Sequence, residues 1–372
     1  MKIGILTHPL RFNYGGILQN YALQQVLLKQ GHDVYTIDWN DDKSLSYRLL
    51  SYLKRLYMHY ILGCKEIQTD FHIHLTRNQF LKKNSKNQEF INKNIRCTKY
   101  ISSKQGLSQI NKMGFDMIVV GSDQVWQKQF VPTMFLDFLD SHIKRISYAA
   151  SFGKSEWIYN IDETNIAKEL IKLFKAISVR EESAIELCKE HLNAKAEWVL
   201  DPTMLLSKFD YERAICSFPD YSPKEPYIMT YILDKNECKR QIQNMVEATT
   251  NLKNYKVETI DSSISNTHNT VYSWVYGIKN SKLVLTDSFH GVVFSIIFNK
   301  PFIAIGNYKR GMDRFTSLLN KLHLSHLLIT NANDIRKVID DSFSINYCEV
   351  NSILEAEKKR SISFITQSIN DL

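Results

Sequence analysis

The first forty residues constrain the fold more than any other part of the chain. Residues 2–7 form a short apolar run, which predicts a strand, and a glycine-containing turn follows at residues 13–16. Residues 17–30 carry apolar side chains at helical spacing, and Gly31 ends this pattern before a second apolar run at residues 32–39. A strand, a loop, a helix and a second strand in this order open a doubly wound parallel sheet.

The same alternation continues to about residue 200. Apolar runs predict strands at residues 115–120, 145–149, 176–179 and 198–200, with helices at residues 163–174 and 181–191. Residues 43–100 differ, because they mix helix and loop and are rich in Tyr, Leu and Lys. Their apolar faces fit either core packing or contact with a membrane surface. We therefore predict a first Rossmann-like domain at residues 1–205.

A second alternation begins after residues 218–226, whose three prolines are typical of a linker. It predicts strands at residues 227–232, 255–259, 283–286 and 301–305, and helices at residues 235–249, 271–279 and 291–298. We expect a second Rossmann-like domain at residues 206–348 and a helix in residues 349–372 that packs back across both halves. The predicted fold class is α/β, with two Rossmann-like domains facing each other across a cleft at the carboxyl ends of their strands.

Charge and cysteine usage narrow the partners. The net charge of +8 suits nucleic acid, an anionic membrane or an anionic substrate, and it also fits a merely lysine-rich chain. The basic residues are dispersed, which argues against nucleic acid. Six cysteines without a Cys-x-x-Cys pair predict reduced thiols, not a disulfide frame or a zinc site. Without a secretory leader pattern or a run of 18 apolar residues, we expect a cytoplasmic protein.

Two polar stretches of the first domain lie next to predicted strand ends. The turn at residues 13–16 can hold an anion through backbone N–H groups at a helix start, or it can be a plain tight turn. It is not G-x-G-x-x-G, so a dinucleotide site is unsupported. In residues 121–126, Asp123 and Gln124 can orient a sugar, or Asp123 can cap a helix while Trp126 enters the core.

Two more strand ends carry candidate groups. Residues 151–153 read either as a turn or as part of a site. Arg180 ends one predicted strand and begins a helix, where its guanidinium can bind phosphate or carboxylate with two nitrogens. The alternative is a surface ion pair between Arg180 and a nearby glutamate.

The second domain holds the sharpest local signal, at residues 286–291. His290 can donate or accept a proton near neutral pH, although a lone histidine is often structural. Residues 309–314 bring three cations to the loop after the next strand, where they can close on an anion or remain solvated. G-x-S-x-G, H-E-x-x-H and P-loop motifs are absent, which argues against an ATP-dependent enzyme of the P-loop class.

Taken together, these stretches resemble the polysaccharide pyruvyl transferase family. The similar segments follow one another from the N-terminus to about residue 315: residues 2–7, Asn13-Tyr14-Gly15-Gly16 with Gln19, residues 120–126, 146–153 and 178–181, Asp201-Pro202-Thr203, and residues 287–291 and 300–302. The resemblance implies a two-domain fold like that of GT-B glycosyltransferases. It also implies transfer of a pyruvyl group from phosphoenolpyruvate to a sugar, as a cyclic ketal, with release of phosphate.

The resemblance also assigns roles to residues. It implies that His290 and Arg180 are catalytic. On the donor side we expect Ser288, Asp287, Gly291, Lys309, Arg310 and Arg314, and on the acceptor side Asn13, Tyr14, Gly15, Gly16, Gln19, Asp123, Gln124, Ser151 and Phe152. Some family members carry a basic residue two positions before the histidine, where this chain has Ser288. We therefore expect either that a cation of residues 309–314 replaces that charge or that the donor differs.

The implied partners are phosphoenolpyruvate and a sugar of a capsule, an exopolysaccharide or a lipid-linked precursor. Phosphoenolpyruvate is a co-substrate, and no cofactor, metal or nucleic acid is expected. A lipid-linked acceptor would bring the enzyme into peripheral contact with the inner face of the membrane. Two other functions fit the same pattern, namely a GT-B glycosyltransferase that uses a nucleotide sugar and a glycan-binding protein without catalysis. No sequence pattern sets the oligomeric state.

Overall fold

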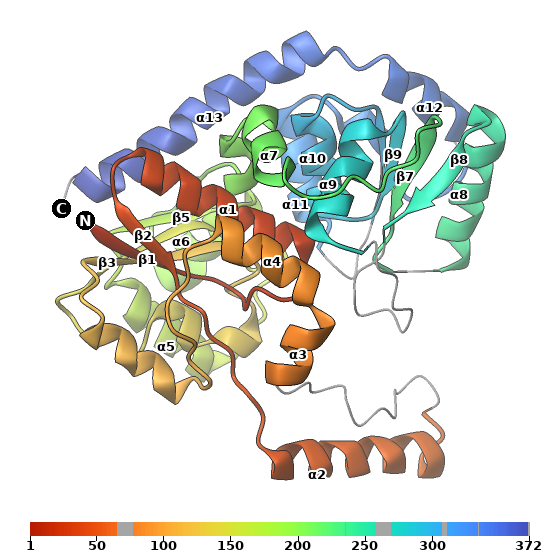
Figure 1. Cartoon of the computed structure of the whole chain (residues 1–372). Coiled ribbons are helices and arrows are strands. Elements are labelled where there is room, and N and C mark those ends of the chain that lie inside the picture. The colour runs from red at the N-terminus through yellow and green to blue at the C-terminus, as the bar shows by residue number, and fades with distance from the viewer. Residues whose placement is uncertain (65–76, 235, 258–268, 307–310, 334, 371–372) are drawn as a thin grey trace.

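The computed structural model describes residues 1–64, 77–234, 236–257, 269–306, 311–333 and 335–370. It contains two parallel sheets, each with helices packed on it, and one long helix that spans both (Figure 1). The predicted α/β class with two Rossmann-like halves is confirmed. The strand at residues 255–259 is observed earlier, as β8 (Lys253–Lys256), and residues 258–268 lie outside the described segments.

The first sheet has six parallel strands in the order β2-β1-β3-β4-β5-β6. Its strands are β1 (Lys2–Leu6), β2 (Asp33–Thr36), β3 (Met117–Asp123), β4 (Lys144–Ala150), β5 (Ala176–Val179) and β6 (Glu197–Trp198). The chain reverses direction across the sheet between β1 and β3, and this reversal is where ligands bind in open parallel sheets.

The second sheet has five parallel strands in the order β11-β10-β9-β7-β8. Besides β8, its strands are β7 (Tyr227–Tyr231), β9 (Leu283–Thr286), β10 (Phe302–Ile305) and β11 (Leu328–Ile329). Read from β8, this is the order of the first sheet without its sixth strand. The equivalent reversal therefore lies between β7 and β9.

Helices cover both sheets. Those between the strands of the first sheet are α1 (Tyr14–Lys29), α2 (Leu45–Leu56), α3 (Arg77–Lys83), α4 (Ser85–Asn94), α5 (Ile161–Ile171) and α6 (Ser183–Leu192). After β6 come α7 (Lys208–Ile215), α8 (Glu237–Thr250), α9 (Val271–Asn280), α10 (Phe289–Ile297), α11 (Asp313–Lys321), α12 (Ile335–Phe343) and α13 (Tyr347–Asn370). Among the helices of the described segments, none is long and apolar enough to cross a membrane.

The predicted packing of the terminal helix across both halves is confirmed. In Figure 1, α13 starts beside the second sheet and ends beside the first. The Tyr347 hydroxyl near its start donates to the Lys300 carbonyl of the second half. Farther along, the Leu200 N–H of the first half donates to Ser361 Oγ at 3.0 Å. The helix therefore ties the two halves together.

Helix α1 lies between the two halves. Its Ile17 and Leu18 belong to one buried apolar cluster with Trp274 of α9 and Phe294 of α10. A helix that is buried on nearly all sides has no large solvent-facing side for charged residues. Accordingly, Lys29 is the one charged residue of α1. Burial of this helix places its N-terminus against the second half.

Of the helices that begin earlier than predicted, α1 and α10 lie at the interface of the two halves and do so for the same physical reason. Asn13 caps α1 because its Oδ1 accepts the Gly16 N–H at 3.1 Å, so the expected turn at residues 13–16 is the first turn of the helix. Ser288 caps α10 in the same way, accepting the Gly291 N–H at 3.4 Å. His290 therefore projects from the first turn of a helix.

Candidate active site at the interface of the two halves

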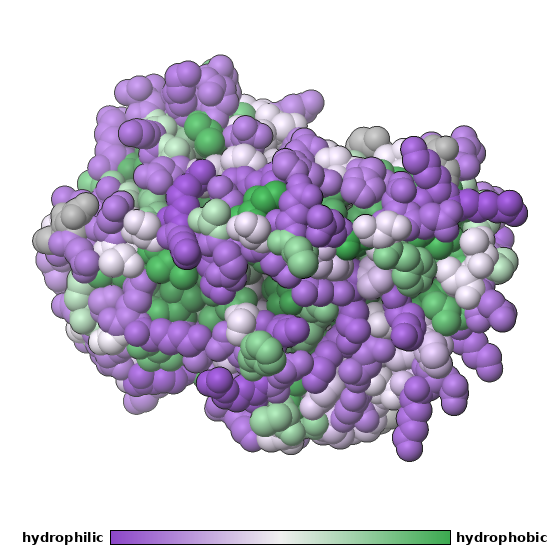
Figure 2. Space-filling view, turned by 90° about the horizontal axis from the view of Figure 1, so that it is seen from above, coloured by the Kyte–Doolittle hydropathy of each residue, from purple (hydrophilic) through white to green (hydrophobic). Residues whose placement is uncertain are grey.

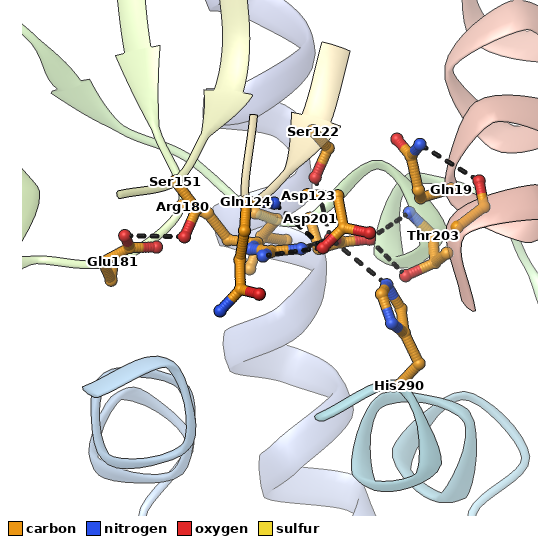
Figure 3. A network of polar contacts seen from close by, with 12 residues as sticks. Gln19, Ser122, Asp123, Gln124, Ser151, Arg180, Glu181, Asp201, Thr203 and His290 are labelled. Carbon is orange, nitrogen blue, oxygen red and sulfur yellow. Dashed lines mark hydrogen bonds and ion pairs between the residues drawn. The ribbon is translucent and has the colours of Figure 1, made fainter. Parts of the chain in front are cut away.

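A buried polar cluster lies where the carboxyl ends of β3 to β6 meet the N-terminus of α10. Figure 3 shows Asp123, Arg180 and Asp201 together on the side of the first sheet, with His290 reaching towards them from α10. Asp123 ends β3 and Arg180 directly follows β5. The parallel sheet thus brings residues distant in the sequence to one edge.

Asp201 is the centre of this cluster. Its Oδ2 accepts hydrogen bonds at 3.0 Å from both Ser122 Oγ and Arg180 Nη1. Its Oδ1 accepts from the backbone N–H and the hydroxyl of Thr203, at 3.0 and 2.6 Å. Burial would raise the pKa of Asp201, but His290 and Arg180 hold it well below the usual range. These contacts therefore favour the ionised carboxylate of Asp201.

Arg180 joins two carboxylates. Besides its contact with Asp201, its Nη2 lies 3.5 Å from Asp123 Oδ1, and its guanidinium carbon lies 5.0 Å from the centre of the Phe289 ring. The side chain is 1% exposed. Burial opposes its charge, but Asp123 and Asp201 raise the pKa of Arg180 above its ordinary value. Its Nε has no hydrogen-bond partner in the part of the chain that the structure describes.

His290 reaches the cluster from the second half. Its Nε2 lies 3.6 Å from Asp201 Oδ2, a contact that becomes an ion pair when the imidazole is protonated. This nitrogen is buried and makes no hydrogen bond to any described residue. The ring also packs against Gly15 of α1, where a Cβ atom would lie 2.1 Å from the imidazole Nδ1. Glycine is thus required where the two halves touch.

Asp123 connects the cluster to the start of α1. Its Oδ2 accepts a hydrogen bond from Asn13 Nδ2 at 3.2 Å, and its Oδ1 accepts the Gln124 N–H at 2.9 Å. Burial would raise the pKa of Asp123, but Arg180, followed by His8, lowers it to about 2. The residue has a φ of +79°, an uncommon conformation for a side chain other than glycine. Such strain is frequent at functional sites.

A third carboxylate, Glu181, lies beside Arg180. Its Oε1 accepts the Ser151 hydroxyl at 2.8 Å and the Phe152 N–H at 3.1 Å. Burial raises its pKa above the usual range, although Arg180 opposes this shift. Ser151 therefore positions Glu181, while the Phe152 ring packs against Trp126.

Arg314 brings a second guanidinium to the same place. It lies in the first turn of α11, not in a loop, and its guanidinium carbon is 5.5 Å from the centre of the Phe289 ring. Burial, followed by the charge of Arg180, lowers its pKa to about 10. Two guanidiniums near one aromatic ring repel each other, and an anion bound between them would reduce this repulsion. Lys309 and Arg310, the other predicted cations, lie outside the described residues.

Several predicted site residues have engaged side chains. Both oxygens of Asp287 accept bonds, from the Leu233 N–H at 2.6 Å and from the Asp234 N–H and Lys239 Nζ at 3.1 and 2.6 Å. These contacts argue that Asp287 holds the loop after β7. Gly291 packs against Thr286, with only 2.3 Å between the Thr286 hydroxyl oxygen and a Cβ at that position.

On the acceptor side, Tyr14 is fully buried, with its ring centre 6.1 Å from that of Tyr231. Gln19 is buried too and donates to Thr7 Oγ1 at 3.1 Å. Of the predicted acceptor residues, Asp123 belongs to the polar cluster and Gln124 lies beside it (Figure 3). Asn13 donates to Asp123.

The sequence reasoning missed Asp201, Glu181 and the hydroxyls of Ser122 and Thr203. Asp201-Pro202-Thr203 is one of the segments similar to the family, close to the predicted end of the first domain at residue 205, but none of its residues is predicted to belong to the site. A signal was present, because Asp201 directly follows the strand predicted at residues 198–200 and Thr203 offers a hydroxyl two positions later. This pairing fixes a turn at the carboxyl end of a strand.

Within the residues that the structure describes, no group of three or more His, Cys, Asp or Glu side chains could hold a metal ion. The chemistry on offer is that of a proton-transferring imidazole beside a permanent carboxylate, together with two buried guanidiniums. Such a set can protonate a bound molecule and stabilise an anion that leaves it.

Comparisons with known proteins identify the family and the fold of the chain. The profile of a family described as polysaccharide pyruvyl transferase matches residues 13–309. No curated protein matches the chain.

Among solved structures, UDP-N-acetylglucosamine 2-epimerase from Rickettsia bellii aligns with a TM-score of 0.51 at 10% identity, covering 99% of this chain and 96% of the other. The UDP-GlcNAc 2-epimerase from Methanocaldococcus jannaschii aligns with a TM-score of 0.50 at 14% identity, covering 93% and 92%. TcCGT1 in complex with UDP aligns with a TM-score of 0.50 at 8% identity, covering 100% and 99%. At such low identity these likenesses show the fold alone, which is GT-B-like.

Proposed function

The chain belongs to the polysaccharide pyruvyl transferase family, and we propose that it transfers a pyruvyl group from phosphoenolpyruvate to two hydroxyls of a sugar, forming a cyclic ketal. The observation that carries this proposal is the interface cluster, in which His290 of one half meets Arg180 and Asp201 of the other. A site assembled from both halves can hold a donor against an acceptor.

The proposed reaction balances without a further reagent. A proton adds to the methylene carbon of phosphoenolpyruvate and makes its neighbouring carbon cationic, like an oxocarbenium ion. One sugar hydroxyl attacks this carbon, the bond to phosphate breaks, and the second hydroxyl closes the ring. The two hydroxyl protons end on the new methyl group and on phosphate.

In this proposal His290 transfers the proton. Its imidazolium form is stabilised by Asp201, 3.6 Å from Nε2, which stays ionised. Asp201 is fixed in turn by Ser122 and Thr203. A fixed carboxylate behind an imidazole favours the charged ring during the reaction without taking the proton itself.

The cations of the cluster would hold the donor. Arg180 already contacts two carboxylates, so a donor anion would meet its remaining N–H groups, including Nε. Arg314 supplies a second guanidinium, whose carbon lies 5.5 Å from the centre of the same Phe289 ring. The N-terminus of α10 adds its partial positive charge. The Ser288 hydroxyl caps this end of the helix, which a side chain without a hydroxyl could not do. We therefore propose that Arg314 replaces the basic residue that some relatives carry at the position of Ser288.

The acceptor would enter beside Asn13, Asp123 and Gln124, whose carboxylate and amide groups suit sugar hydroxyls. It is proposed to be a sugar of a surface polysaccharide or of its lipid-linked precursor. Because phosphoenolpyruvate is made in the cytoplasm, the reaction is placed there.

The test is incubation of the full chain with phosphoenolpyruvate and a panel of glycan acceptors. We expect release of phosphate together with a new ketal methyl signal in the NMR spectrum. His290→Ala should abolish both, whereas His323→Ala should not, because the His323 imidazole is exposed and lies 3.2 Å from Glu349 on the surface. Full turnover by His290→Ala would refute the assignment. Stabilisation by UDP but not by phosphoenolpyruvate would instead favour a nucleotide-sugar transferase.

A further inference from the structure

Helix α2 and the turn that follows it expose more apolar surface than any other segment in the described part of the chain. We call residues 45–62 the α2 segment. Leu50, Tyr60 and Ile61 are 67%, 70% and 69% exposed, and Leu45, Tyr47, Leu49, Leu53, Tyr57 and Leu62 are exposed as well. In Figure 1, α2 stands apart from both sheets at the bottom of the molecule. Exposed apolar patches of this kind mark interaction surfaces.

The exposed residues form a stripe on one face of the helix. Leu45, Leu49 and Leu53 follow one another at intervals of four residues, which places them on the same side of a helix. The side of the helix turned towards the fold carries Arg48, which is buried, and Arg55, which is half-buried. The helix therefore turns its polar side inward and its apolar side to solvent, the reverse of a helix that serves the core.

The charge of the segment is one-sided. Residues 43–64 contain four Lys or Arg residues and no Asp or Glu. They also contain four tyrosines, whose rings suit the boundary between water and lipid. An amphipathic helix with leucine and tyrosine on one face, and with cations but no anions, is the type that lies on anionic bilayers.

The rest of the surface does not repeat this pattern. The face seen from above in Figure 2 is mostly hydrophilic, with apolar side chains in small groups. Other exposed apolar residues, such as Ile161 and Phe209, belong to different helices. The stripe is thus a local feature of the α2 segment.

We propose that the α2 segment docks the protein onto the surface of an anionic lipid bilayer. A second copy of the chain is the poorer occupant, because pairing two α2 segments would set the exposed Lys54 of one copy against that of the other, with no carboxylate in residues 45–62 of either. Anionic headgroups complement these cations, and the apolar stripe enters the boundary beneath them.

The connection of the segment to the fold gives docking a consequence. The chain reaches α2 directly from the carboxyl end of β2, and β2 runs parallel to β1 and β3. The carboxyl ends of these strands form the edge that holds Asp123 and Arg180. A bilayer bound by α2 therefore lies on the catalytic side of the first half. This step rests on the proposed function, and it favours a lipid-linked acceptor over a free polysaccharide.

The test is flotation of the full chain with vesicles of phosphatidylcholine, with or without phosphatidylglycerol. We expect the wild type to float with the anionic vesicles and to be released by salt. The double variant Leu49→Gln/Leu53→Gln should bind roughly tenfold more weakly for each leucine removed. The matched control is Ile166→Gln/Leu173→Gln on or just after α5, whose side chains are 44% and 51% exposed, and it should bind like the wild type. Lys54→Glu should weaken binding to the anionic vesicles only.

Three results would overturn the proposal. One is a wild type that floats with neither vesicle. Another is a lipid-free dimer, seen by light scattering, that the double leucine variant converts to monomers, because a second copy would then cover the stripe. The third is loss of turnover on a water-soluble acceptor fragment in that variant, because the stripe would then belong to the site. Failure of the proposed function looks different, since flotation would persist while the wild type released no phosphate.

Discussion

Two aspartates occupy corresponding positions in the two sheets and have different partners. Asp123 ends β3 and Asp287 directly follows β9, each beside the point where the strand order reverses. Asp123 contacts Arg180 and Asn13, two side chains from other elements. Asp287 contacts two backbone N–H groups and Lys239, all from the segment after β7.

The difference teaches that topology selects the position but partners select the role. Backbone N–H groups cannot move away from Asp287, so they hold a loop in one conformation. Apart from the neighbouring Gln124 N–H, the partners of Asp123 are side chains at the interface of the two halves, and an entering ligand can compete for them. Only the arrangement around Asp123 leaves polar groups that can exchange one partner for another.

Replacing the cation beside each aspartate should give the largest contrast. Arg180→Met leaves Asp201 and Asp123 buried without their cation, which should cost about 3–5 kcal/mol of unfolding free energy and roughly 1000-fold or more in turnover. Lys239→Met should cost a comparable free energy, because Asp287 is fully buried, but change turnover only a few-fold. Urea unfolding and phosphate release measure the two effects.

Arg180→Lys is the control for charge, and it should retain stability better than turnover because a single ammonium nitrogen lacks the planar fork by which Arg180 reaches Asp201 and Asp123. An Arg180→Met enzyme that is unstable yet fully active would remove Arg180 from the site. An inactive Lys239→Met enzyme with normal stability would bring Asp287 into it.

The aspartates themselves should separate the two roles in opposite directions. Asp287→Asn should cost about 2–3 kcal/mol, because an amide cannot accept from both N–H groups and the lysine. Asp123→Asn should cost less stability and lower turnover by about 10–100-fold, since it weakens the fixing of Arg180. The comparison collapses if both variants lose stability and turnover in the same proportion.

The sequence predicted the strands well because parallel buried strands are short apolar runs, and those at residues 176–179 and 283–286 have the predicted bounds. It predicted the starts of α1 and α10 too late, because Asn13 and Ser288 extend these helices by caps that apolar periodicity does not detect. Residues 43–64 stayed ambiguous because a core helix and a surface-docking helix have the same period.

The site was harder to predict than the fold. Arg180 and His290 were named, but their meeting depends on Gly15, which lets α10 approach α1. That contact joins residues far apart in the sequence, and no local pattern encodes it. Asp201 was overlooked because a carboxylate followed by proline also fits a domain boundary.

Replacing Gly15 should have an intermediate effect on stability and turnover. It should disturb the cluster that contains Asp123 but not the contacts of Asp287. Alanine normally stabilises a helix relative to glycine by about 1 kcal/mol, yet Gly15→Ala would place its Cβ 2.1 Å from the His290 Nδ1. We expect a loss of about 1–3 kcal/mol and a lower turnover as His290 is displaced from Asp201.

Gly16→Ala is the matched control. The atoms nearest to its Cβ would be those of the Asn13 side chain, at 3.2 Å and beyond, so we expect a change of less than about 1 kcal/mol. Equal stability and turnover for the two variants would show that the halves do not pack closely at His290.

The smallest expected effect concerns pH, and it contrasts two carboxylates of the cluster. The folded pKa of Asp123 is about 2, below its ordinary 3.8, so its stabilising contribution is present above about pH 4 and is lost as the pH falls towards 2. Between about pH 5 and pH 3 this loss should amount to about 1 kcal/mol.

The folded pKa of Glu181 is raised, so its ionised form costs stability near neutral pH and the cost disappears as the pH falls through that pKa. In urea titrations, acidification should therefore narrow the stability advantage of the wild type over Asp123→Asn and improve the wild type relative to Glu181→Gln. Parallel responses of the two variants would mean that Arg180 does not affect the pKa of Asp123 differently from that of Glu181.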